Sequence, residues 1–253
     1  MKNILSHFVV GFCRNMFLRM PRPQAVSFLM TFVRVYVGKL SPDEALRFLF
    51  DLDARLYSLQ GQMSVQYDHG VHTKHRHMRY HDFFVNRVAR GESVLDLGCG
   101  QGAVAYDLAK KGGCKVVGID LEEKNIAMAK EKHSHPDIEY IVGDVLHSLP
   151  ARTYDVVVLS NVLEHLDGRS DFLSGVARVT SARRFLIRVP LFERDWRVPL
   201  KKELGVEWRL DPTHQTEYTL ESFDEEIRNA GMSIVHQEVR WGEVWAEAVV
   251  DAA

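Results

Sequence analysis

The sequence predicts an α/β fold with an open, mostly parallel sheet and a ligand crevice at the sheet's carboxyl edge. Short apolar runs alternate with helical patterns, several of these runs end in an acid, and one leads into a glycine-rich turn. Strands buried on both faces are nearly all apolar, and open α/β sheets bind ligands outside the carboxyl ends of their strands. The 253 residues, 46% apolar and 26% charged, suffice for one such domain and an appendage.

Helices are expected before the sheet. Ser41 and Glu44 fit a capping box, and apolar residues then recur at helical spacing until Gly61, which is expected to end the helix. A second helical pattern covers residues 73–89. We therefore expect a helical cap, or a substrate-facing or membrane-facing extension, over residues 1–90.

The sheet-bearing domain is expected over residues 91–253. Its predicted strands are residues 94–97, 116–120, 140–144, 155–161, 184–189, 233–239 and 244–250. Helices are predicted from residue 103, over 170–179 and over 219–231. The dipeptide Trp241-Gly242 predicts a hairpin between the last two strands.

The first strand carries Asp96 and leads into Gly98, Gly100 and Gly102. Glycine lets the backbone turn tightly and approach a ligand, because no Cβ stands in the way. The glycines alternate and do not follow the G-x-G-x-x-G pattern, so the turn suits a ligand without a pyrophosphate. The second strand ends at Asp120, 20 positions after Gly100, where a carboxylate reaches a ribose diol.

With these motifs, residues 92–166 resemble S-adenosylmethionine-dependent methyltransferases of the Rossmann-like class. The resemblance implies a seven-stranded sheet with an antiparallel last strand, and S-adenosylmethionine as cofactor. It assigns the methionine part to Asp96 and to the loop Gly98, Cys99, Gly100 and Gly102, the ribose to Asp120, and the adenine to Leu121, Asp144 and Val145. Asn161 is also expected to touch the cofactor.

A histidine-rich segment precedes the first strand and contains His77 and His81, spaced one helical turn apart. It lacks cysteines, and its basic neighbours would repel a cation, so we do not expect a metal there. In the resembled family the helix at this place often covers the cofactor. Arg76 or Arg79 would bind the cofactor carboxylate, and Tyr80 would close the pocket.

The candidate catalytic residues are Glu164, His165 and His214. Asn161 and Glu164 are spaced to share one helix face, with His165 adjacent. A carboxylate and two imidazoles above the cofactor would make a divalent-metal site, or either histidine would act as a base without metal. The pattern resembles E-x-x-E-H with a distal histidine in small-RNA 2′-O-methyltransferases and ubiquinone-pathway O-methyltransferases, but Asn161 replaces the first glutamate.

Residues 191–217 are too long for a simple connection. Their aromatic residues indicate an ordered segment, and their position after the fifth strand predicts a substrate wall at the carboxyl edge.

The first 42 residues contain no acid, and their apolar stretches over 4–17 and 25–37 are shorter than a membrane-spanning helix. They form either a helical cap or a basic amphipathic anchor on an anionic membrane, with contact through residues 1–40. Three widely spaced cysteines indicate a reducing compartment. The expected location is the cytoplasm, with peripheral contact at the inner face of a membrane.

These observations predict a methyltransferase acting on a hydroxyl of a small or lipid-linked acceptor, such as a sugar, glycolipid or quinol. A nucleic-acid methyltransferase is a rival that the net charge of −2 does not favour. The second rival is an accessory subunit that binds the cofactor and has no catalytic activity of its own.

Overall fold

The computed structural model describes residues 14–252 and divides the chain into two compact units, one ending at Ser58 and the other beginning at Leu59. The first unit contains helix α2 (Arg22–Val37) and the start of α3 (Pro42–Tyr67). The Glu44 carboxylate accepts hydrogen bonds from the Ser41 backbone N–H and hydroxyl, at 3.0 and 2.7 Å, so the expected start of α3 is confirmed.

Two expectations about the helices before the sheet are wrong. Gly61 does not end α3, which continues to Tyr67, because a single glycine costs a helix only about 1 kcal/mol. The helix expected over residues 73–89 is broken at Arg79, where φ is +53°. The two pieces are α4 (Lys74–Met78) and α5 (Tyr80–Val85), so His77 and His81 are not one helical turn apart.

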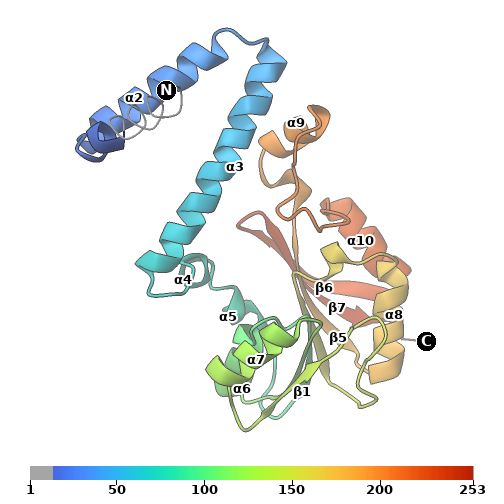
Figure 1. Ribbon diagram of the computed structural model, residues 1–253. Coiled ribbons are helices and arrows are strands. Elements are labelled where there is room, and N and C mark those ends of the chain that lie inside the picture. The colour runs from blue at the N-terminus through green and yellow to red at the C-terminus, as the bar shows by residue number, and fades with distance from the viewer. Residues whose placement is uncertain (1–13, 253) are drawn as a thin grey trace. The chain divides into compact units, whose positions relative to one another are not determined.

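The second unit is built on a seven-stranded sheet of order β3-β2-β1-β4-β5-β7-β6 (Figure 1). The strands are β1 (Ser93–Leu97), β2 (Lys115–Asp120), β3 (Ile138–Val142), β4 (Val156–Ser160), β5 (Arg184–Pro190), β6 (Met232–Arg240) and β7 (Glu243–Val250). Strands β1 to β5 pair in parallel, and β7 is antiparallel to both β5 and β6. The predicted fold class is confirmed, including the antiparallel last strand and the hairpin at Trp241-Gly242.

Helices cover both faces of this sheet (Figure 1). On one face lie α5, α6 (Ala103–Lys110) and α7 (Glu123–Lys132); on the other lie α8 (Arg169–Thr180) and α10 (Leu220–Asn229). Alternate residues of β4 pack on opposite faces of the sheet. Val156 and Val158 lie in the core beneath α5, α6 and α7, and Val157 and Leu159 lie in the core beneath α8 and α10. This period of two in a fully apolar strand is what burial on both faces requires.

The segment 191–217 is ordered, as its aromatic residues indicated. It contains the 3₁₀ turn η2 (Phe192–Arg194) and the helix α9 (Arg197–Glu203). The rings of Phe192 and Trp208 meet edge to face with centroids 5.3 Å apart, and the Lys202 ammonium lies 4.9 Å from the Trp208 ring.

Candidate cofactor and acceptor site

The glycine turn after β1 has the backbone conformation that its sequence predicted. Gly98, Gly100 and Gly102 have φ angles of +67°, +54° and +80°. A Cβ on Gly98 would lie 2.6 Å from Val162 Cγ2, and a Cβ on Gly102 would collide with the Tyr140 ring. The turn therefore needs glycine for its conformation and for its close packing. Cys99, within the turn, is nearly buried.

Asp120 at the end of β2 is joined to this turn by hydrogen bonds. One carboxylate oxygen accepts from the Gly100 backbone N–H at 2.8 Å, and the other accepts from Glu122 N and Asn125 Nδ2, both at 3.0 Å. The adjacent Leu121 is 65% exposed, which leaves its side chain open to a flat ring. The carboxylate that the resemblance assigned to the ribose is thus held in place at the carboxyl edge.

Asp96 is 1% exposed, and its Oδ2 has no hydrogen-bond partner among the described residues. Burial, with a smaller contribution from the negative charge of Asp120, raises the pKa of this carboxyl to about 7. An unpartnered buried carboxylate oxygen beside a glycine turn is suited to a cationic ligand group, because a charged partner would offset the cost of burial. The amino group of a bound S-adenosylmethionine fits this requirement.

The remaining residues assigned to the adenine lie just beyond β3. Asp144 accepts hydrogen bonds from Leu146 N at 2.9 Å and His147 Nδ1 at 2.8 Å, and the His147 bond lowers the pKa of its carboxyl. Val145 is partly buried against the core on the α8 side. Both follow the end of β3, two and three positions after Val142.

Arg76 lies on α4 with its Nε 3.3 Å from Asp68 Oδ2, and Arg79 pairs with Asp82. Contact of Arg76 with the cofactor carboxylate stays a prediction. Tyr80 is buried, and its hydroxyl lies 2.9 Å from His75 Nδ1.

Glu164 lies in the 3₁₀ turn η1 (Leu163–His165) after β4. Its side chain is fully buried, both carboxylate oxygens lack partners among the described residues, and burial raises its pKa to about 8. Asn161 is not on the same helix face, which corrects the expectation, because its φ of +59° places it before η1 in a left-handed conformation. Its buried Oδ1 is also unpartnered.

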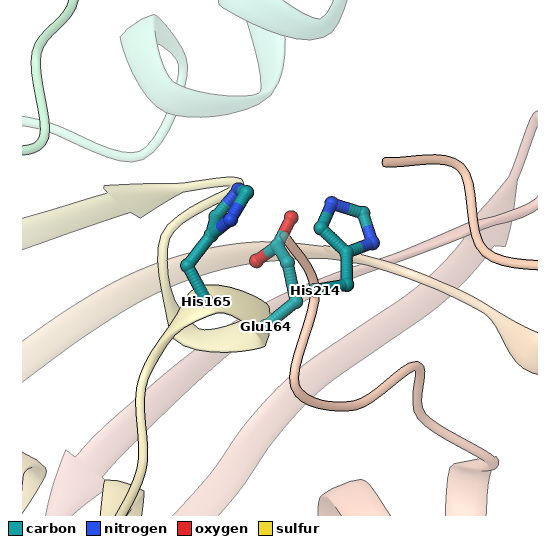
Figure 2. A group of neighbouring side chains, drawn as sticks. All are labelled: Glu164, His165 and His214. Atoms are coloured by element: carbon teal, nitrogen blue, oxygen red, sulfur yellow. The ribbon is translucent and has the colours of Figure 1, made fainter. Parts of the chain in front are cut away.

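The two candidate histidines meet beside Glu164, whose carboxylate lies between their rings (Figure 2). The ring centroids of His165 and His214 are 4.7 Å apart, and one ligand atom from each of the three residues lies within 4.8 Å of the others. The Gln215 backbone N–H donates to the Glu164 carbonyl at 2.7 Å. The prediction that these three residues converge is confirmed in geometry.

The hydrogen bonds of both imidazoles set the same tautomer. The Thr213 hydroxyl donates to Asp211 at 2.7 Å, so at 2.9 Å it accepts from His165 Nδ1. His214 Nδ1 donates to Glu217 Oε1 at 3.2 Å. Because a neutral imidazole carries one proton, Nε2 of each ring is left as an acceptor.

Glu217 was not identified from the sequence. Its side chain is fully buried and also accepts a hydrogen bond from Arg194, so it links His214, near the end of the 191–217 segment, to the start of the same segment. Its position three residues after His214 was a signal that could have pointed to it.

A buried ion pair was also missed. Arg188 on β5 binds both oxygens of Glu243 at 2.6 and 2.7 Å, donates to Ser160 Oγ at 3.1 Å and lies 3.9 Å from the Tyr80 ring centre. Trp245 Nε1 donates to the same carboxylate at 2.9 Å. No local pattern joins residues this far apart in the sequence.

Comparison with known proteins identifies a methyltransferase domain in this chain. Residues 95–187 match the model of the methyltransferase domain family. The chain is 28% identical over 155 residues to a ubiquinone biosynthesis O-methyltransferase of Rhodopseudomonas palustris, covering 58% of this chain and 60% of the relative. It is 33% identical over 115 residues to ribosomal protein L11 methyltransferase of Thermotoga maritima, covering 44% and 42%.

Residues 95–187 therefore form a methyltransferase domain, and the fold is the Rossmann-like fold of solved S-adenosylmethionine-dependent methyltransferases. The chain spans less than two thirds of the length of the two relatives named above. The magnesium protoporphyrin IX methyltransferase of Synechocystis, solved with S-adenosylhomocysteine, has a similar fold, with a TM-score of 0.55, 21% identity and coverage of 69% of this chain and 84% of that one.

Proposed function

We propose that this methyltransferase transfers a methyl group from S-adenosylmethionine to a hydroxyl of a small or lipid-linked acceptor, with quinols as the first class to test. The observation that carries the proposal is the convergence of Glu164, His165 and His214 at the carboxyl edge of the sheet. Relatives named as ubiquinone biosynthesis O-methyltransferases support a hydroxyl as the acceptor, and one named as a 2-methyl-6-phytyl-1,4-hydroquinone methyltransferase supports quinols as the acceptor class.

The cofactor would be held by the turn of Gly98 to Gly102, by Asp96 at its amino group and by Asp120 at its ribose. When bound, it supplies a methyl group on a positively charged sulfur. The protein's own contribution is to align the acceptor oxygen with that methyl group in a site from which water is excluded.

His214 is the proposed base. Its Nε2 is free to take the hydroxyl proton, and Glu217 at Nδ1 would stabilise the imidazolium that forms. Burial and the neighbouring His214 lower the pKa of His165, which favours its neutral form, and His165 would orient the acceptor through its own Nε2.

A divalent metal is the alternative use of the same residues. The Nε2 tautomer fits a metal ligand, but Asn161 offers an amide oxygen in place of a second carboxylate. Ligand atoms as much as 4.8 Å apart would also have to approach one another, because zinc–ligand bonds are about 2.0–2.2 Å long. This geometry favours the metal-free base.

Two other functions can be distinguished from this one by experiment. Salt-dependent binding of RNA or DNA would favour a nucleic-acid acceptor. Cofactor binding without product in any acceptor mixture would favour an accessory subunit.

The experiment measures S-adenosylhomocysteine formation from a panel of quinols, catechols and sugars by wild type, His214→Ala and the control His236→Ala, which lies on β6. We expect His214→Ala to lower kcat by about 100-fold or more, as loss of a general base does, with unchanged cofactor binding. The His236→Ala variant should match wild type. Turnover of His214→Ala within a few fold of wild type would show that His214 is structural.

A further inference from the structure

Helix α2 presents large apolar side chains to solvent over its whole length. None of its residues is buried, and Val26, Leu29, Phe32 and Val35 are between 52% and 70% exposed. Phe28, Met30 and Tyr36 are also exposed. Exposed apolar patches of this extent mark interaction sites, because isolated apolar residues are the rule on ordinary surfaces.

Four of the five polar side chains of α2 lie on one stripe, and the fifth, Arg22, is the first residue of the helix. Gln24, Ser27, Thr31 and Arg34 follow one another at spacings of three and four, and the Thr31 hydroxyl donates to the Ser27 carbonyl at 2.9 Å. The rest of the 16-residue helix is almost entirely apolar. Among the described residues no helix is long and apolar enough to cross a bilayer.

The charge around this helix has one sign. No acid precedes Asp43, and the exposed basic residues of the described part before it are Arg14, Arg19, Arg22, Arg34 and Lys39. Basic residues beside a wide apolar face complement an anionic lipid surface, where the apolar side chains enter the acyl boundary and the cations contact headgroups.

We propose that residues 14–40 bind an anionic phospholipid surface, with α2 lying in the plane of the membrane. At 1.5 Å per residue the helix covers about 24 Å of that surface. This inference goes beyond the proposed function, since it concerns a surface of the first unit and not the chemistry of methyl transfer.

The test uses the full-length protein and flotation with two kinds of vesicle: phosphatidylcholine alone, and equal parts of phosphatidylcholine and phosphatidylglycerol. We expect flotation with the anionic vesicles only, weakened by added salt. Arg22→Gln with Arg34→Gln should weaken binding by about 25-fold, at about fivefold for each charge near the surface. Leu29→Ser with Phe32→Ser should abolish it.

Val235→Ser is the matched control, because Val235 is an exposed apolar residue on β6 and its change should leave flotation unaltered. Circular dichroism and cofactor binding verify that each variant is folded. Two outcomes would overturn the proposal: no flotation of wild type, or equal flotation with both vesicles. If the wild type does not float, light scattering of wild type and of Leu29→Ser with Phe32→Ser tests whether a dimer is lost in the variant. Loss of that dimer would show that a second copy covers α2. None of these outcomes depends on methyl transfer.

Discussion

Replacing Asp120 with alanine should remove most of the affinity for the cofactor. In the structure its two carboxylate oxygens accept three hydrogen bonds and hold the turn at Gly100. In the proposed complex the same oxygens also accept from the two ribose hydroxyls. A hydrogen bond to a charged group contributes about 1.5–3 kcal/mol, so losing two weakens binding by at least ~3 kcal/mol, or about 150-fold.

Calorimetry with S-adenosylhomocysteine measures this loss directly. Asn125→Ala is the control, because it removes one bond to the same carboxylate and leaves the charge in place; we expect a change of less than about tenfold. Thermal unfolding of each variant separates lost affinity from lost stability. Binding by Asp120→Ala within threefold of wild type would refute the assignment of Asp120 to the ribose.

Three further perturbations test the site. Because the pKa of Asp96 is raised to about 7 and a cationic ligand group requires its ionised form, cofactor affinity should fall as the pH drops below ~7, by about tenfold per pH unit. Calorimetry across pH checks this, and the slope should vanish in Asp96→Asn; a flat wild-type profile would contradict it. Gly98→Ala should lower the free energy of unfolding by more than about 2 kcal/mol, because the position has a positive φ and the new Cβ would press on Val162. Gly100→Ala should lower it by only ~1 kcal/mol, because φ is also positive there but no atom lies within 4 Å of the new Cβ. Equal melting temperatures for these two variants would refute the packing argument. Dialysis against a chelator should leave turnover within about twofold if the base acts without metal, and activity lost and then restored by one divalent cation would show the opposite.

The half of the site formed by β1, β2 and β3 could be predicted from the sequence because its signals are local. Asp96, Gly98 and Gly100 lie within five residues of one another, and Asp120 follows at a fixed separation. Their positions depend on strand ends and turn conformations, which a short stretch of sequence determines. The carboxyl-edge convergence of His214 with Glu164 was also predicted, since both follow strands of the same sheet.

The features that escaped prediction depend on tertiary packing. The break at Arg79 occurs in a helical pattern with no proline or glycine, so nothing local indicated it. The pair of Arg188 and Glu243 was missed because β7 is antiparallel: its first residue, not its last, lies at the carboxyl edge of the parallel strands. A search for polar residues at strand carboxyl ends would never reach Glu243.

The attachment of the 191–217 segment has an evolutionary consequence. The backbone N–H groups of Gln215 and Thr216 donate hydrogen bonds to the backbone carbonyl of Glu164, at 2.7 and 3.3 Å. A hydrogen bond between two backbone groups does not depend on which side chains the residues carry. Side chains of the segment other than Arg194, His214 and Glu217 can therefore be exchanged while His214 stays beside Glu164. If the proposed function holds, selection can change the acceptor by substitutions in this one segment, and the strand ends proposed to bind the cofactor need not change.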